Sequence, residues 1–236
     1  MATTRPLLEA RGLTRRFGGL TAVGAVDLDL GPGEVHALIG PNGAGKTTLV
    51  SLISGRLLPD EGTIRFEGRD ITRLPAHARV RLGIAYTFQI TAVFPRLSVF
   101  DKVALAAQRH APDLAAATRA ALARVGLDAH ADRLAGTLAY GHQRLLEVAM
   151  GLALNPKLLI LDEPTQGLAR SEIAAFKSLV RSIAPSAAVL LIEHDMDVVM
   201  DLAQRITVLD AGRRLATGTP EEVRADPAVQ AAYLGA

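Results

Sequence analysis

The alternation of apolar and polar positions along the chain predicts two kinds of β-strand. Residues 26–30 (Val-Asp-Leu-Asp-Leu) and 62–68 alternate with the period of two that is typical of a half-buried strand. Residues 158–161 and 187–192 are instead continuously apolar, as in strands that a parallel sheet buries on both faces. A further strand is predicted at residues 7–13. These patterns together favour an α/β fold.

The middle of the chain has a helical pattern instead, with Ala and Leu at helical spacing and no strand period. The helices predicted there span residues 98–107, 112–125 and 141–154. We therefore interpret residues 90–155 as a helical insertion between the two halves of an α/β core, residues 1–89 and 156–236. Another amphipathic helix is predicted at 171–183, and two short helices are predicted near the end of the chain, around 221–223 and 228–233.

One short stretch between an apolar run and a predicted helix has the pattern of a phosphate-binding loop. Residues 40–47 (Gly-Pro-Asn-Gly-Ala-Gly-Lys-Thr) fit G-x-x-x-x-G-K-[ST]. Gly40, Gly43 and Gly45 would let backbone N–H groups wrap closely around a polyphosphate. Lys46 would place a charge on the β- and γ-phosphates, and Thr47 a hydroxyl on Mg²⁺. A glycine-rich turn with an exposed lysine is the alternative. The strand before the loop and the helix after it favour the nucleotide site.

Two carboxylates end the apolar run at residues 158–161. Asp162 and Glu163 lie where open α/β sheets bind their ligands, beyond the carboxyl end of a strand. Acidic residues often follow strands as turn formers, and without the phosphate loop that alternative would be favoured. With the loop, Asp162 is predicted to hold Mg²⁺ and Glu163 to orient or deprotonate the attacking water.

Three other positions carry candidate chemistry with weaker signals. Phe17 precedes two glycines and could stack on a base, although a core phenylalanine is about equally compatible with these residues. His194 follows a buried strand, and this position alone sets it apart. Gln89 by itself is typical of polar surface. The remaining histidines are interpreted as surface or satisfied core residues: His36, His77, His110, His130 and His142.

Composition excludes several classes of function. The chain has no cysteine, so it has neither disulfides nor thiolate metal sites. A formal net charge of +2 is too small to indicate a nucleic-acid partner. No apolar run reaches the roughly 18 residues of a membrane span, and the first residues lack a signal-peptide core. We therefore expect a soluble, cytoplasmic protein.

Taken in order, these motifs resemble those of the ATP-binding-cassette (ABC) ATPases over essentially the whole chain. Residues 40–47 match the Walker A loop, Gln89 the Q-loop glutamine, and 158–162 the Walker B strand. Glu163 matches the catalytic glutamate and His194 the switch histidine.

The signature motif of the family aligns with residues 138–144 (Leu-Ala-Tyr-Gly-His-Gln-Arg). Phe17 falls at the adenine-stacking position, which favours that role over the core alternative.

The resemblance implies a P-loop NTPase (RecA-like) core with an antiparallel β subdomain and an inserted α-helical subdomain, all within one nucleotide-binding domain. It implies ATP and Mg²⁺ as ligands, with each ATP closed between two subunits. The residues that it implicates in nucleotide binding are Phe17, Gly40, Asn42, Gly43, Gly45, Lys46, Thr47, Thr48, Ala139, Gly141 and His142. Those for catalysis are Lys46, Gln89, Glu163 and His194, and those for the metal are Thr47, Gln89 and Asp162.

The implied partners are a second ABC ATPase, as homodimer or heterodimer, integral membrane permeases, and indirectly a periplasmic solute-binding protein. The implied location is the inner face of the cell membrane, with no nucleic acid bound.

Details of the motifs resemble importers of branched-chain amino acids. They include residues 87–89 followed by 94–99, the Tyr-Gly pair in the signature, Ile-Glu-His-Asp-Met-Asp at 192–197, and the ending at 218–223 and 232–235. Urea and short-amide importers share this branch. The alternatives are a lipopolysaccharide-export ATPase, whose signature usually keeps two glycines, and a soluble ABC switch in repair or translation. The latter predicts a basic surface or a second cassette, and neither is present in the sequence.

Two positions depart from the family pattern. Ala139 replaces the signature serine, and Ala169 replaces an acidic or amide residue after Gly167 and Leu168. Loss of the serine removes one hydrogen bond to a charged phosphate, worth about 1.5–3 kcal/mol if nothing compensates. We therefore expect a competent but weakened site across the dimer interface.

Overall fold

The computed structural model describes residues 5–87, 94–108 and 112–234. A mostly parallel sheet of six strands lies at its centre, in the order β10-β9-β3-β8-β7-β6, with only β10 antiparallel to its neighbour. Its strands are β3 (Val35–Ile39), β6 (Ile84–Tyr86), β7 (Leu158–Asp162), β8 (Ala188–Ile192), β9 (Arg205–Asp210) and β10 (Arg213–Gly218).

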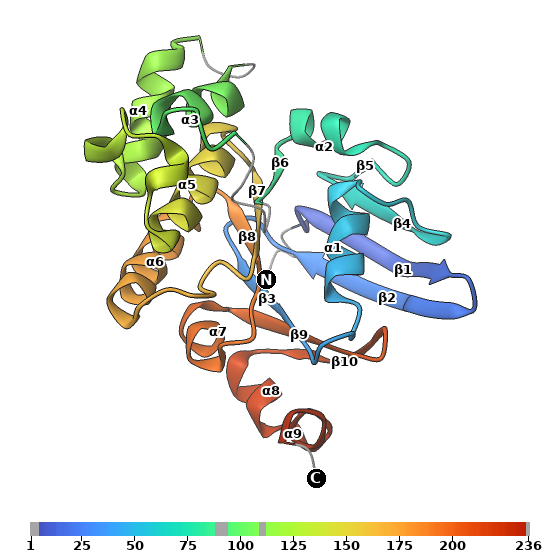
Figure 1. Cartoon of the computed structure of the whole chain (residues 1–236). Helices are drawn as coiled ribbons and strands as arrows, with labels where there is room; N and C mark the ends of the chain where they lie inside the picture. Colours follow the sequence, from blue (N-terminus) through green and yellow to red (C-terminus); the bar gives the residue numbers. More distant parts are fainter. Residues whose placement is uncertain (1–4, 88–93, 109–111, 235–236) are drawn as a thin grey trace.

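A second, antiparallel sheet lies on the other side of α1 from the helical region (Figure 1). Its order is β2-β1-β4-β5, and its strands are β1 (Leu8–Phe17), β2 (Leu20–Leu30), β4 (Glu61–Phe66) and β5 (Arg69–Asp70). Of the alternating segments predicted from the sequence, residues 26–30 lie in β2 and residues 62–66 in β4, while 67 and 68 form the turn after β4. A parallel and an antiparallel sheet in one α/β chain confirm the predicted fold class.

The helices gather around the central sheet. They are α1 (Lys46–Ser54), α2 (Ala76–Leu82), α3 (Val99–Ala107), α4 (Leu114–Arg124), α5 (Tyr140–Ala153), α6 (Arg170–Ile183), α7 (Met196–Leu202), α8 (Pro220–Ala225) and α9 (Pro227–Leu234), with short 3-10 turns at Asp128–His130 and Ala135–Thr137. Helices α3, α4 and α5 pack on one another, on the side of the central sheet away from β1 and β2 (Figure 1). Every element described between β6 and β7 is helical, as the sequence predicts.

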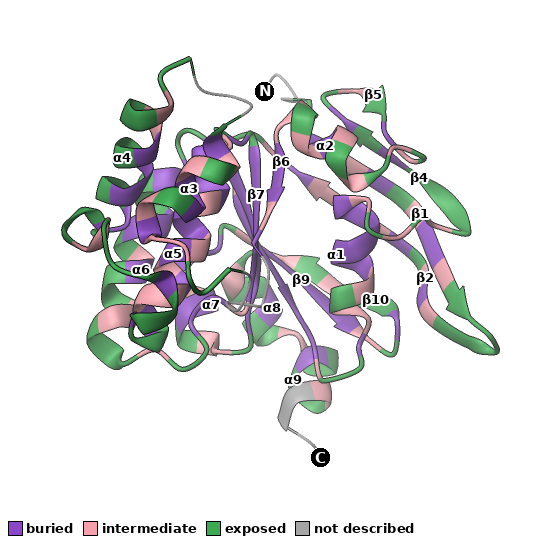
Figure 2. Ribbon diagram, turned by 45° about the horizontal axis from the view of Figure 1, so that its top comes forward, coloured by how far each residue is buried: buried purple, intermediate pink, exposed green. Residues whose placement is uncertain are grey.

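The continuously apolar strands are buried (Figure 2), and their two faces pack into two different hydrophobic clusters. In β7, Leu159 and Leu161 join the cluster that contains α5 and α6, while Leu158 and Ile160 join the cluster that contains α1 and the antiparallel sheet. Alternate side chains of a strand point to opposite faces, so a strand covered on both faces needs apolar residues at every position. A third cluster packs α7, α8 and α9 against β3 and β9.

Among the described residues, no helix is both long enough and apolar enough to cross a membrane.

Candidate nucleotide-binding site

The loop between β3 and α1 can be built only with glycine at two positions. Gly45 has φ 98°, and a Cβ added there would lie 2.4 Å from the backbone oxygen of Ala22. At Gly40, φ is 154° and a Cβ would lie 2.2 Å from the backbone oxygen of Leu209. Backbone at that distance cannot give way as a flexible side chain would. The loop is thus held tightly against β2 and β9, with Gly43 and Asn42 exposed at its outer side.

Lys46 opens α1 and turns its side chain back over the loop. Its Nζ donates hydrogen bonds to the backbone oxygens of Gly40, at 2.6 Å, and Pro41, at 3.0 Å. Burial lowers the pKa of Lys46, while the carboxylates of Glu163 and Asp162 act in the opposite direction. A cation folded over a loop that leads into a helix start without a side-chain cap is suited to a polyphosphate.

Asp162 ends β7 as a buried carboxylate with a tyrosine partner. The hydroxyl of Tyr86, the last residue of β6, donates a hydrogen bond of 2.6 Å to Oδ2 of Asp162. Burial raises the pKa of Asp162, and it also raises the pKa of Tyr86 well above its ordinary value. Tyr86 was not identified from the sequence, where nothing marks it beyond its place shortly before Gln89.

Glu163 and His194 complete the carboxyl edge of the sheet. Glu163 has φ 48°, and its N–H donates to the backbone oxygen of Ile192 at 2.9 Å. Its charge acts on the pKa values of Lys46 and Asp162, and the pairing of β3 and β7 with opposite sides of β8 brings the ends of these strands to one edge of the sheet. His194 follows β8 with an exposed ring, whose Nδ1 lies 3.9 Å from a carboxylate oxygen of Glu193. Three parallel strands thus bring the loop lysine, the acid pair and this histidine to the same edge.

Phe17 lies at the end of β1 and is 46% exposed, with the Arg15 guanidinium carbon 5.0 Å from the ring centroid. The core-phenylalanine alternative is therefore wrong, and the ring is available to a ligand. Thr47 is exposed and Thr48 half-buried in the first turn of α1. Gln89 lies outside the described residues.

The signature segment opens α5. Ala139 is the N-cap residue and provides no side-chain cap. The Tyr140 ring contacts the backbone at Gly167, where an added Cβ would lie 2.7 Å from Cε1. At Gly141 an added Cβ would lie 2.3 Å from the Glu172 carboxylate, so a larger residue would displace that side chain. The start of α5 therefore packs on the segment that leads from β7 into α6. Tyr140 remains 45% exposed.

Among the described residues, no group of three or more His, Asp or Glu is arranged to hold a metal ion. Asp162 and the Thr47 hydroxyl are oxygen ligands of the kind that Mg²⁺ prefers, and phosphate oxygens would be needed to complete such a site.

A parallel sheet with a glycine loop before its first helix, and an acid pair at the end of another strand, defines a P-loop nucleotide-binding protein. The family described as ABC transporter matches residues 23–166. The chain belongs to this family, and it is an ATP-binding-cassette ATPase.

The chain is similar to named ATP-binding proteins of transporters over almost its full length. The chain is 41% identical to the high-affinity branched-chain amino acid transport ATP-binding protein BraF of Pseudomonas aeruginosa, over 98% of this chain and 99% of that one. It is 40% identical to LivG, which has the same description, of Escherichia coli strain K12, again over 98% and 99%. An ATP-binding cassette of an ABC transporter, solved in its ADP conformation, superposes with a TM-score of 0.89 at 28% identity, covering 99% of this chain and 100% of that one.

Proposed function

We propose that the chain is the ATP-hydrolysing subunit of an importer that takes up branched-chain amino acids or related amides through separate membrane permeases. Support for the solute class comes from the relatives at 40–41% identity. It also comes from the match of residues 213–236 to a family described as branched-chain amino acid ATP-binding cassette transporter. The observation that carries ATP hydrolysis is that the parallel strands β3 and β7, on either side of β8, deliver Lys46 and the Asp162–Glu163 pair to the same edge of the sheet.

The proposed roles follow from position. Lys46 and backbone N–H groups of the loop at residues 42–48 bind the phosphates, with Asn42 and Thr48 at the rim of the loop, and Phe17 stacks on adenine. Thr47, Asp162 and Gln89 hold Mg²⁺, which when bound neutralises charge on the β- and γ-phosphate oxygens. Glu163 orients the attacking water, and His194 donates a hydrogen bond to the γ-phosphate.

The site is proposed to close across a dimer. The exposed start of α5, with Ala139, Gly141 and His142, would meet the γ-phosphate bound by a second subunit, either a copy of this chain or a related cassette. Its packing on the segment after β7 supports this, because α5 and the loop beyond Glu163 would then move as one body. The proposed parts are a core (1–89 and 156–236), which includes the antiparallel β subdomain, and a helical subdomain (90–155).

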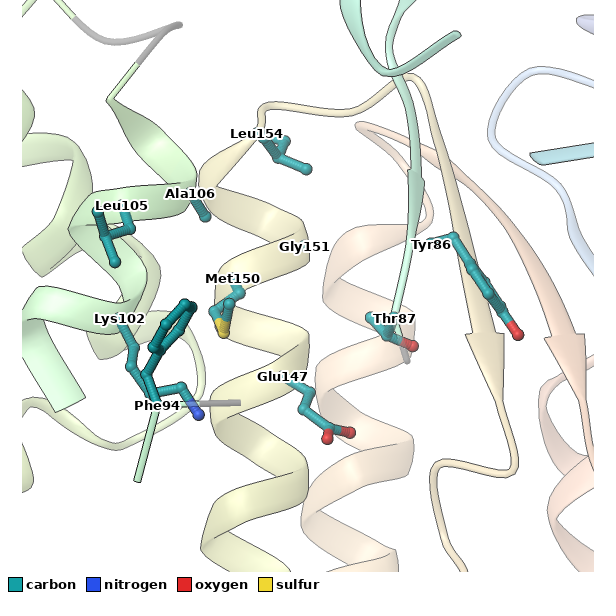
Figure 3. A pocket seen from close by; sticks show the side chains of 10 residues that line it. All are labelled: Tyr86, Thr87, Phe94, Lys102, Leu105, Ala106, Glu147, Met150, Gly151 and Leu154. Atoms are coloured by element: carbon teal, nitrogen blue, oxygen red, sulfur yellow. The ribbon is translucent and has the colours of Figure 1, made fainter. Parts of the chain in front are cut away.

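An apolar pocket of about 450 Å³ lies between these parts (Figure 3). It is lined by Leu105 and Lys102 of α3, by Met150 of α5, by Tyr86 at the end of β6 and by Thr87 directly after it. A helix of a permease is proposed to dock here, at the inner face of the membrane. Tyr86 lines the pocket and also holds Asp162, so it joins the docking surface to the nucleotide site.

The first experiment compares Glu163→Gln with a matched control, Glu221→Gln, which changes an exposed acid on α8. Glu163→Gln should keep ATP binding but lower the turnover number by about 10²–10⁴-fold, as expected when a general base is lost. The control should hydrolyse ATP like the wild type. Near-normal hydrolysis by Glu163→Gln would remove Glu163 from its proposed role.

The second experiment addresses assembly and solute. ATPase rate per chain should rise with protein concentration, and Glu163→Gln should dimerise when ATP is added. Membrane vesicles with the cognate permeases and binding protein should take up labelled leucine, isoleucine or valine, or a short amide such as urea, only with ATP inside. A concentration-independent rate in a strict monomer contradicts the shared site, and uptake of none of these solutes contradicts the proposed import.

A further inference from the structure

Glu193, directly after β8, is a charged residue buried almost completely, at 1% exposure. One carboxylate oxygen, Oε1, accepts hydrogen bonds from the N–H of Thr165 at 2.9 Å and from the Thr165 hydroxyl at 2.5 Å. The other oxygen, Oε2, accepts from the N–H groups of His194, at 3.1 Å, and Asp195, at 3.5 Å. Burying a carboxylate is costly unless its oxygens are satisfied, and here four donors converge on them.

The Glu193 carboxylate holds the loop after β7 at a point that the hydrogen bonds between β7 and β8 do not reach. The pairing of β7 with β8 ends at Asp162 opposite Ile192, followed by one further bond from the Glu163 N–H to the Ile192 oxygen, at 2.9 Å. Pro164 then has no N–H to donate. The next backbone donor is Thr165, and it is bonded by the Glu193 side chain. The Glu193 carboxylate thus continues the attachment of this loop past the end of the sheet.

Two segments with proposed catalytic roles are fixed by this one side chain. Glu163 lies between its own bond to Ile192 and the Thr165 bonds to Glu193, which hold the chain on both sides of it. His194 is attached through its backbone N–H to the same carboxylate. We propose that Glu193 is a positioning residue for ATP hydrolysis, and that it sets the place of Glu163 relative to His194 through Thr165. This inference rests on the proposed roles of Glu163 and His194.

The hydrogen-bond inventory makes the role testable. All four groups around the carboxylate are donors, and a glutamine of the same shape has only one acceptor oxygen. Glu193→Gln therefore turns an NH₂ group toward donors on one side without changing the volume. Thr165→Val removes the hydroxyl donor and keeps the N–H, whereas Thr165→Ser keeps both. Thr118→Val is the matched control, since Thr118 is fully buried on α4 and its hydroxyl donates to the Leu114 oxygen at 2.7 Å.

The test measures steady-state ATPase activity and melting temperature on the full chain and its variants. Glu193→Gln should lower kcat by about 10²-fold, the cost of misplacing catalytic groups by roughly 1 Å, with little change in KM for ATP. Thr165→Val should lower kcat in the same sense but less, and Thr165→Ser should recover most of it. The double variant Glu193→Gln/Thr165→Val should lose no more than Glu193→Gln alone, because both changes break one unit. Thr118→Val should keep kcat, whatever it loses in melting temperature.

The inference is overturned if Glu193→Gln and Thr165→Val retain wild-type kcat while Glu163→Gln is inactive. It is also overturned if Thr118→Val shows the same ratio of kcat loss to melting-temperature loss as Glu193→Gln and Thr165→Val. A general loss of stability would then account for the effect. Should Glu193→Gln fail to fold, the comparison of Thr165→Val with Thr165→Ser decides alone. A wild-type chain without ATPase activity, or an active Glu163→Gln, contradicts the proposed function itself and with it this inference.

Discussion

Replacing Arg79 should destabilise the protein more than its place on a short helix suggests. Arg79 of α2 is fully buried, and its guanidinium donates to four backbone oxygens. Two belong to the last turn of α1, Leu52 at 2.6 Å and Ile53 at 2.8 Å, and the others are Leu74 at 2.9 Å and Thr72 at 3.0 Å. Burial lowers the pKa of Arg79 to about 10, which still leaves it cationic at neutral pH. It therefore caps the helix that carries the phosphate loop.

The magnitude follows from the carbonyls that Arg79→Met would strand. The methionine keeps apolar volume but no donor. The Leu52 oxygen retains a weak bond from the Gly55 N–H, at 3.3 Å, so three carbonyls depend most on the arginine. At about 1–1.5 kcal/mol for each unsatisfied acceptor, the free energy of unfolding should fall by about 3–5 kcal/mol. For a chain of this size that corresponds to a melting temperature lower by about 6–20 °C.

Urea and thermal unfolding followed by circular dichroism would measure this loss. The matched control is Arg81→Met, an exposed arginine on the same helix, which should change the free energy of unfolding by no more than about 0.5 kcal/mol. Equal losses in the two variants, or a loss below about 1 kcal/mol for Arg79→Met, would refute the reasoning, since either result means that water or relaxation replaces the guanidinium.

Three further predictions concern the nucleotide site. Tyr86→Phe removes the hydrogen bond to Asp162, so the Mg²⁺ concentration for half-maximal ATPase activity should rise about 10-fold, and an unchanged Mg²⁺ titration would contradict the role of Asp162. Gly45→Ala should abolish a stable loop, because the added Cβ would meet backbone atoms. Gly43→Ala adds a Cβ that meets no atom, so its positive φ should lower the free energy of unfolding by only about 1–2 kcal/mol. Similar losses for the two variants in urea unfolding would disprove the close approach at Gly45. Ala139→Ser should add about 1 kcal/mol of stability, because serine can cap the N-terminus of α5. It should also raise turnover or tighten ATP-driven dimerisation if the new hydroxyl reaches the γ-phosphate bound by the second subunit. A gain in stability alone would show that Ala139 does not weaken the site.

Features that depend on contiguous residues were predictable from the sequence. The phosphate loop is a run of eight residues whose glycines meet local conformational demands, and both positive φ and close backbone approach are found at Gly40 and Gly45. The acid pair was predictable because a fully apolar run of four residues reports burial on both faces of β7. The two-residue β5, three-residue β6 and seven-residue α2 and α7 were not predicted, because elements of this length repeat a period too few times to stand out from the surrounding sequence.

Residues whose role depends on a distant partner could not be found in the same way. Tyr86 is separated from Asp162 by 76 positions, and Glu193 from Thr165 by 28. In the sequence Arg79 is one more charge in a polar stretch, although the structure buries it. In each case the residue type is common, and only the fold supplies the partners that give it a function. His194 was singled out because it follows a buried strand, whereas Glu193 beside it was given no role from the sequence.

The order of the strands explains why the end of β8 positions both the phosphate loop and the loop after β7. In the sheet, β8 lies between β3, which leads to Lys46, and β7, which leads to Glu163. The phosphate loop and the proposed catalytic acid are therefore not on neighbouring strands, and each is placed by its pairing with β8: Leu38 opposite Ile192 on one side, Asp162 opposite Ile192 on the other. A carboxylate one residue beyond Ile192 is thus in the position from which the loop after β7 can be held relative to the phosphate loop. A residue at the end of β3 or β7 would reach only one of them.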